Sequence, residues 1–182
     1  VEEAIINPVV SGRLNIMKVN SKDQVGAIID RLKLLPHPEG GYYRETYKCD
    51  RQISVSDGRE RTVGTAIYYL LTESTFSEMH RLRFDEIFHF YMGDAVEMLQ
   101  LHEGQSTVHL LGTDLSNGQV PQLLVPAGVW QGSRLVPGGQ FALLGTTMTP
   151  GFDFADYEQG RRSELISAYP QQRSLIEYLT RV

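Results

Sequence analysis

Between residues 42 and 147, short runs of β-branched and aromatic residues alternate with compact turn signals, and this pattern most limits how the chain can fold. The turn signals include Met92-Gly93-Asp94 and Pro137-Gly138-Gly139, in which glycine beside polar residues or proline favours tight reversals. Many short strands at close spacing predict a mainly β domain, built as a sandwich or barrel. The expected strands cover residues 42–49, 62–71, 75–82, 86–92, 95–102, 106–111, 120–125, 133–136 and 140–147.

Helical patterns lie on both sides of this β region. Residues 21–24 (Ser-Lys-Asp-Gln) can form a capping box, and apolar residues follow it at helical spacing. Pro36 and Pro38 end that helix, and the sequence predicts two short helices near the C-terminus, over 163–168 and 170–180. The predicted apolar stripe of the first helix consists of Val25, Ile28, Ile29, Leu32 and Leu35.

Length and charge limit the class of protein. A chain of 182 residues has enough material for one sizeable core. We expect residues 1–20 to be an N-terminal extension and residues 21–182 to form a single domain. The net charge of −5 argues against non-specific binding to nucleic acid or to an anionic membrane. No apolar run is long enough to span a bilayer, and the single cysteine, Cys49, is consistent with a cytoplasmic protein.

The segment from His80 to Gly93 has the pattern that is most informative about function. If it forms two strands joined by a short turn, Glu78, His80 and Leu82 share one face of the first strand. Glu86, Phe88, Phe90 and Met92 share one face of the second strand. If both faces point inward, an imidazole and a carboxylate project into a space with aromatic walls.

This segment resembles the first motif of the cupin superfamily, G-x5-H-x-H-x3-E-x6-G. It matches that motif at His80, Glu86 and Gly93, whereas Ser74 stands at the first glycine and Leu82 at the second histidine. The order and spacing of the matching residues are those of the motif.

A later segment resembles the second cupin motif, G-x5-P-x-G-x2-H-x3-N. Pro126 and Gly128 match its middle, whereas Val120, Gln131 and Leu135 replace the first glycine, the histidine and the asparagine. Two motifs in the right order within a β-rich pattern are more specific than either motif alone.

A closer resemblance, over nearly the whole length, is to the cupin subfamily called DUF985 or cupin-5, for which no activity is agreed. It implies a double-stranded β-helix (cupin, jelly-roll) barrel, with an N-terminal helix and short C-terminal helices. The segments that carry it are Pro-Glu-Gly-Gly-Tyr-Tyr-Arg-Glu-Thr (38–46), Ala-Ile-Tyr-Tyr-Leu-Leu (66–71), residues 80–93, Val-Pro-Ala-Gly-Val-Trp-Gln (125–131) and Pro-Gly-Phe-Asp-Phe-Ala-Asp-Tyr-Glu (150–158).

Metal-binding cupins typically hold their ion with three histidines and one glutamate. Here the resemblance transfers only His80 and Glu86, with Gln131 as a weak third donor, because Leu82 cannot coordinate. We therefore expect no cofactor, and a metal-dependent oxygenase or isomerase remains the third hypothesis.

The same residues suit acid–base chemistry, with His80 as base and Glu86 as its orienting partner. The first hypothesis is a metal-independent, isomerase- or epimerase-like enzyme acting on a small polar or sugar-like compound. The second is a protein that binds a metabolite without changing it. A purely structural His–Glu pair is the simpler alternative to both. Tyr68 or Tyr69, whichever faces inward, can supply a phenol as proton donor. The expected ligand-binding residues are Tyr68, Glu78, Phe88, Phe90, Trp130 and Gln131.

Three further features have simpler interpretations. The segment 38–41 (Pro-Glu-Gly-Gly) is interpreted as a turn rather than a binding loop, and His37 as a surface or turn residue. Residues 150–158 suit either a lid over the site or an anchor that packs on the sheet.

The resemblance, together with strand edges that need covering, predicts a homodimer. Sedimentation at micromolar concentration should give twice the chain mass of 20.5 kDa. A single species with the mass of one chain would contradict this prediction.

Overall fold

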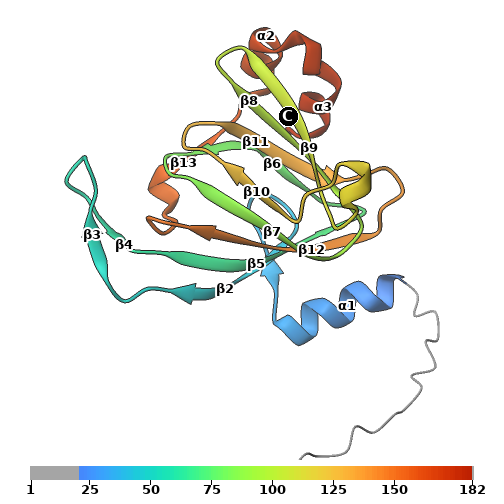
Figure 1. The fold of residues 1–182 in the computed structure, drawn as a ribbon, viewed down its shortest axis with the longest axis horizontal. Coiled ribbons are helices and arrows are strands. Elements are labelled where there is room, and N and C mark those ends of the chain that lie inside the picture. The colour runs from blue at the N-terminus through green and yellow to red at the C-terminus, as the bar shows by residue number, and fades with distance from the viewer. Residues whose placement is uncertain (1–20, 182) are drawn as a thin grey trace, which may run out of the picture.

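Two antiparallel sheets make up most of the structure, a computed structural model that describes residues 21–181 (Figure 1). The predicted extension over residues 1–20 lies outside the described residues. The first sheet contains, in spatial order, β1 (Leu35–Pro36), β2 (Tyr42–Lys48), β5 (Thr65–Thr72), β12 (Phe141–Met148), β7 (Glu86–Gly93) and β10 (Gln122–Val125). The second contains β13 (Tyr157–Gln159), β6 (Phe76–Leu82), β11 (Trp130–Leu135), β8 (Val96–His102) and β9 (Gln105–Leu111).

The remaining elements lie outside the two sheets. Strands β3 (Gln52–Ser54) and β4 (Glu60–Thr62) form a hairpin that projects away from the body (Figure 1). The helices are α1 (Ser21–Leu32), α2 (Arg162–Ala168) and α3 (Arg173–Tyr178), with short 3-10 turns at Leu115–Asn117, Phe154–Asp156 and Pro170–Gln172. No helix among residues 21–181 is long and apolar enough to cross a membrane.

The main apolar core fills the space between the two sheets. Tyr69, Leu71 and Leu144 come from the first sheet, and Val96 and Met98 come from the second. Because successive side chains of a strand point to opposite faces, the alternate residues of β5 and β12 point outward. The fold is therefore mainly β, with two facing sheets as in a jelly roll, and the predicted fold class is confirmed.

Helices cover the outer face of each sheet. Val25, Ile28, Ile29 and Leu32 of α1 pack against Leu70, Phe141 and Leu143 of the first sheet. On the second sheet, α2 and α3 cover Met79, Leu99 and Leu101 with Leu165 and Ile176. Both helical regions are thus packing elements.

The structure differs from the predicted elements in three places. Leu35 does not continue the α1 stripe: it lies in β1 and is 64% exposed, because the residue before a proline is driven to extended backbone. The predicted strand 62–71 is divided between β4 and β5, and the predicted helix 170–180 is a 3-10 turn followed by α3. Strands β1, β3 and β13 are too short to show periodicity in the sequence.

Candidate functional site

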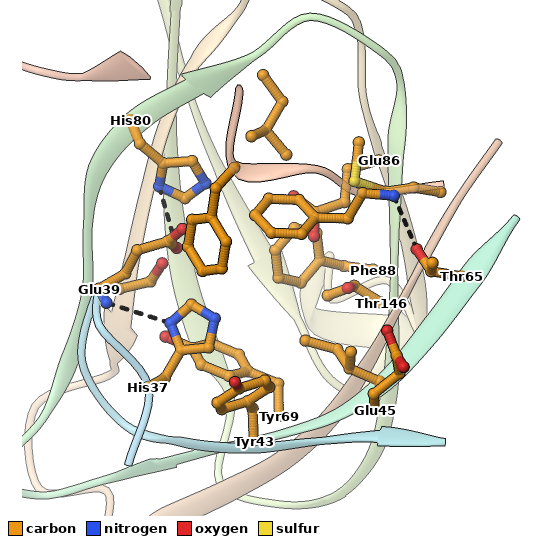
Figure 2. A pocket seen from close by; sticks show the side chains of 16 residues that line it. His37, Glu39, Tyr43, Glu45, Thr65, Tyr69, His80, Glu86, Phe88 and Thr146 are labelled. Carbon is orange, nitrogen blue, oxygen red and sulfur yellow. Dashed lines mark hydrogen bonds and ion pairs between the residues drawn. The ribbon is translucent and has the colours of Figure 1, made fainter. Parts of the chain in front are cut away.

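A cavity of about 250 Å³ lies between the sheets, beside the apolar core (Figure 2). That is several times the volume of about 30 Å³ that a water molecule occupies in the liquid, so the cavity can hold a small organic molecule. Both sheets, residues 37–39 and residues 152–154 contribute to its wall. The lining residues are His37, Glu39, Tyr43, Glu45, Thr65, Ile67, Tyr69, Ser77, His80, Leu82, Glu86, Phe88, Thr146, Met148, Phe152 and Phe154.

A β-bulge in β6 determines which of its residues face the cavity. Gln131 of β11 is opposite His80, and Ser133 is opposite Ser77. Between these pairs β6 advances by three residues and β11 by two, so β6 has one extra residue. Ser77 and His80 therefore point to the same side, although simple alternation would separate them. Both side chains line the cavity, and both are 3% exposed.

The imidazole of His80 is held in one tautomer. Its Nδ1 lies 2.7 Å from the Glu78 carbonyl oxygen, which can only accept, so Nδ1 carries the proton. The ring of Tyr157 stacks on the imidazole, with the centroids 5.3 Å apart. Burial lowers the pKa of His80, against the opposing influence of Glu86, so the ring is neutral and Nε2 has a free lone pair.

Glu86 reaches the same cavity from β7. Its Oε2 accepts a hydrogen bond of 2.6 Å from Nε2 of Gln131. Burial raises the pKa of Glu86, and the nearby His80 and the Gln131 bond oppose that rise without cancelling it. The carboxyl group is therefore more easily kept protonated than one in water.

Glu39 is the carboxylate that contacts His80, and the sequence analysis did not identify it. Its Oε2 lies 3.4 Å from His80 Nδ1 (Figure 2). Burial, followed by the charge of Glu78, raises the pKa of Glu39 to about 8. Segment 38–41, interpreted above as a plain turn, thus supplies part of the cavity wall.

The glycines of this segment allow Glu39 to reach the cavity. Gly40 has φ +112°, and a Cβ there would lie 2.1 Å from the Phe76 carbonyl oxygen. This close approach lets the Glu39 carbonyl oxygen accept a hydrogen bond of 3.1 Å from the backbone N–H of Glu78, next to the bulge. The paired glycines were the signal in the sequence.

His37 begins a turn, as predicted, since its carbonyl oxygen accepts a hydrogen bond of 3.0 Å from the Gly40 N–H, but its side chain lines the cavity. Its Nδ1 accepts a hydrogen bond of 3.2 Å from the Glu39 N–H, and its ring meets Tyr43 and Tyr69 edge-on. Burial, followed by the influence of His80, lowers the pKa of His37 to about 4. This imidazole is therefore uncharged at neutral pH.

Known relatives share this fold. Residues 26–160 match the profile of the family described as Cupin_5, cupin superfamily (DUF985). The chain belongs to this cupin family. An uncharacterized protein of Saccharomyces cerevisiae is 34% identical over 145 residues, which cover 71% of this chain and 72% of the yeast protein.

Two solved structures of similar proteins are close to this cupin over most of its length. A hypothetical protein from Leishmania major has 29% identity and a TM-score of 0.81, over 86% of this chain and 98% of that one. A protein from Shewanella oneidensis has 35% identity and a TM-score of 0.78, over 85% and 96% respectively.

The structure brings together only some of the residues predicted for the ligand site of this cupin. His80, Glu86 and Phe88 line the cavity. Gln131 does not line it, but its side chain donates a hydrogen bond to Glu86. Tyr68 does not line it, because its neighbour Tyr69 takes the inward position on β5, and Tyr68 packs near α1 instead.

Three more predicted residues lie elsewhere. The bulge turns Glu78 away from the cavity, and its Oε1 accepts hydrogen bonds from the backbone N–H of Arg181 and the side chain of Gln159. Trp130 packs in the outer cluster of the second sheet, beneath the guanidinium of Arg81. Phe90 packs against the core between the sheets and does not line the cavity.

The donor set does not fit the metal site of a typical metal-holding cupin. Leu82 lines the cavity where the motif has a second histidine, and the amide nitrogen of Gln131 donates to Glu86. Within residues 21–181, no group of three or more His, Cys, Asp or Glu side chains is arranged to hold an ion. The cupin motif positions thus supply two good ligands, His80 and Glu86, which are fewer than stable transition-metal sites use.

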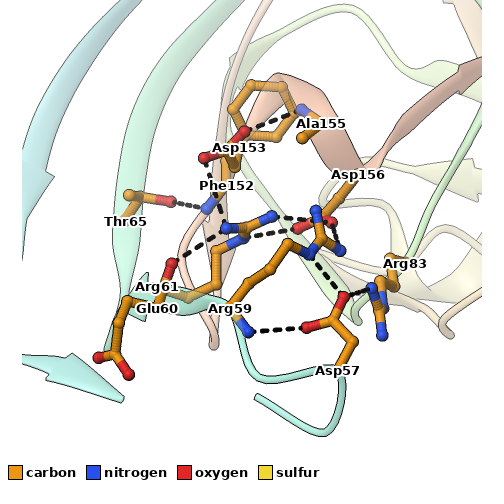
Figure 3. A network of polar contacts seen from close by, with 10 residues as sticks. All are labelled: Asp57, Arg59, Glu60, Arg61, Thr65, Arg83, Phe152, Asp153, Ala155 and Asp156. Carbon is orange, nitrogen blue, oxygen red and sulfur yellow. Dashed lines mark hydrogen bonds and ion pairs between the residues drawn. The ribbon is translucent and has the colours of Figure 1, made fainter. Parts of the chain in front are cut away.

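An ionic network fixes the segment that forms the mouth of the cavity (Figure 3). Asp156, whose side chain is 2% exposed, lies 3.0 Å from Arg61 Nε and 2.8 Å from Arg59 Nη2. Asp57 extends the network to Arg83. These contacts connect the β3–β4 hairpin to the segment 150–158. The same segment places Phe152 and Phe154 on the cavity wall, so it is an anchored part of that wall.

The raised pKa of Glu39 predicts a pH-dependent effect on stability. Between pH 4.5 and about 8, Glu39 is protonated in the folded protein and ionised in the unfolded chain. The protonated Glu39 therefore contributes its full stabilisation below pH 4.5, and this contribution is lost as the pH rises to about 8. Relative to Glu39→Gln, the free energy of unfolding of the wild type should fall over this range, by at most about 1.4 kcal/mol per pH unit. Urea unfolding across the range measures it.

The control for this experiment is Glu103→Gln, because the side chain of Glu103 is 83% exposed. Its pH dependence should follow that of the wild type. If the curve for Glu39→Gln also ran parallel to the wild type, Glu39 would not be a buried, protonated acid.

The network at the mouth predicts a large cost for Asp156→Asn. The substitution leaves the buried guanidinium of Arg61 with only one carboxylate contact, at 3.7 Å to the partly exposed Asp153, which should lower the free energy of unfolding by about 3 kcal/mol. Glu164→Gln, which breaks the exposed Arg161–Glu164 pair, should cost about 0.5 kcal/mol or less. Equal costs in urea unfolding would show that the network does not stabilise the protein.

Proposed function

We propose that the cavity binds a small polar molecule and that His80 and Glu86 exchange protons with it without a metal. The observation that carries this proposal is the tautomer of His80. Its proton is committed to the Glu78 carbonyl, which leaves Nε2 as a neutral base in the cavity wall that also holds Glu86. A neutral imidazole with an unprotonated ring nitrogen can act as a general base.

The two groups suit opposite roles in one proton transfer. His80 accepts a proton from the bound molecule, and the protonated carboxyl of Glu86 donates one at another position. The protein returns to its starting state when a proton passes from His80 to Glu86 through solvent or the product. A reaction of this kind moves a hydrogen without oxidation, as in an isomerase or epimerase.

Glu39 takes the role that the sequence analysis gave to Glu86. Glu39 lies 3.4 Å from Nδ1 of His80. An imidazolium formed when Nε2 takes a proton would favour release of the Glu39 proton to solvent, and the resulting carboxylate would stabilise the positive charge. Glu86, held by Gln131, is then free to act on the ligand directly. The hydroxyl groups of Ser77 and Thr146 in the same wall offer further hydrogen bonds to a polar ligand.

Burial also argues for a site rather than a structural pair. Keeping Glu39 and Glu86 in an apolar wall costs stability, since each side chain is less than a tenth exposed and has a raised pKa. A structural pair would be expected to lower the pKa of its carboxyl groups.

The proposal predicts exchange of a carbon-bound hydrogen with solvent. The protein should be incubated in D2O with hexoses and hexosamines, and with any molecule recovered from it, while proton NMR follows the loss of C–H signals. His80→Asn keeps a donor for the Glu78 carbonyl but has no base, so exchange should fall by about 100-fold or more. Glu86→Gln should have a similar effect, and Glu103→Gln none.

Two outcomes would separate the alternatives. A compound that binds without exchange, and whose affinity alone changes in His80→Asn, would show a metabolite-binding protein. Exchange that disappears on dialysis against a chelator and returns with one added metal would show a metal-dependent cupin.

A further inference from the structure

Among the described residues, the wall of the cavity carries three glutamates and no lysine or arginine. The glutamates are Glu39, Glu45 and Glu86. Glu39 and Glu86 are buried, whereas Glu45 is exposed at the edge of the cavity (Figure 2).

The arginines of neighbouring segments are directed elsewhere. Arg181 donates to the carbonyl oxygens of Pro38 and Glu39, and its Nη1 lies 3.3 Å from the Glu78 carboxylate, behind the cavity wall. Arg61 pairs with Asp156 at the mouth.

The two imidazoles do not supply the missing positive charge either. His37 accepts a hydrogen bond at Nδ1 from a backbone N–H, and its burial opposes protonation. His80 is likewise neutral when its Nδ1 donates to the Glu78 carbonyl. No cationic side chain of the described chain therefore offsets the two buried carboxyl groups from within the cavity.

This charge distribution discriminates between ligands. An anion entering the cavity would lose its hydration with no arginine or lysine to compensate, and it would oppose ionisation of the two buried acids. Burial by itself favours the protonated forms of Glu39 and Glu86. A bound cation would favour loss of these protons to solvent, because each ionised carboxylate would then have a counter-charge.

The rest of the wall also suits a cation. The rings of five aromatic side chains line the cavity: Tyr43, Tyr69, Phe88, Phe152 and Phe154. The faces of aromatic rings attract organic cations, most strongly where water is excluded.

We propose that the cavity is selective for a small organic amine in its ammonium form, with the ammonium group against Glu39 and Glu86 and the carbon skeleton against the aromatic wall. This inference rests on the binding role proposed for the cavity and does not require proton transfer. It names the charge of the ligand, which the acid–base argument leaves open.

Three probes of one shape and different charge test the proposal: cyclohexylammonium, cyclohexanol and cyclohexanecarboxylate. Calorimetry or ligand-observed NMR on the wild-type protein at neutral pH should show the ammonium binding at least about tenfold more tightly than the alcohol. The carboxylate should bind more weakly than either. This comparison uses only the wild-type protein, so it does not depend on the folding of a variant.

Variants then locate the selectivity. Glu39→Gln and Glu86→Gln should each weaken binding of the ammonium by about tenfold or more and change binding of the alcohol by no more than about threefold. Glu103→Gln should change neither, since its side chain is 83% exposed.

The outcomes distinguish this proposal from the proposed function. Equal affinity for the three probes, tighter binding of the alcohol or carboxylate, or no binding of the ammonium would overturn the amine proposal. The D2O experiment with sugars could still succeed in each of those cases. Selective binding of the ammonium, lost in both cavity variants, would support the proposal even if no compound showed exchange.

Discussion

The bulge in β6 is the constraint on which the site depends. Its residues, Glu78 and Met79, find backbone partners outside the sheet: Glu78 N–H donates to Glu39, and Met79 N–H donates to Leu179. The Met79 carbonyl in turn accepts from Gly160. Three segments far apart in the sequence therefore meet at one irregularity, and this arrangement directs His80 into the cavity and Glu78 out of it.

The electrostatics of the cavity follow from which cupin motif residues are replaced. In a metal-holding cupin, the ion offsets the charge of the motif glutamate. Here Leu82 and Gln131 replace two of the usual ligands, so that glutamate, Glu86, is left with a hydrogen-bonding amide instead of a cation. Burial then favours its protonated form, and Glu39 is in the same situation beside His80. The replacements by Leu82 and Gln131 are consistent with both proposals, proton transfer by Glu86 and binding of a cationic ligand beside it.

The outer parts of the fold position this chemistry. The β3–β4 hairpin projects from the first sheet, and its arginines hold Asp156 (Figure 3). Helices α2 and α3 pack on the outer face of the second sheet, next to the chain end that contacts the bulge. A mainly β framework therefore presents a cavity wall made of strand and loop residues, and the chain end supports the bulge from outside the cavity.

By itself, the sequence determined the β-rich class, most strand positions, the flanking helices and the placement of His80, Glu86 and Phe88 on inward faces. Those features depend on local periodicity and turn chemistry, which neighbouring residues specify. Only the tertiary structure decided that Tyr69 rather than Tyr68 points inward, that Glu78 turns away, and that Glu39 contacts His80. Strand pairing sets the position of a bulge, and a loop reaches a distant side chain only after the sheets have packed. Periodicity along the chain carries neither kind of information.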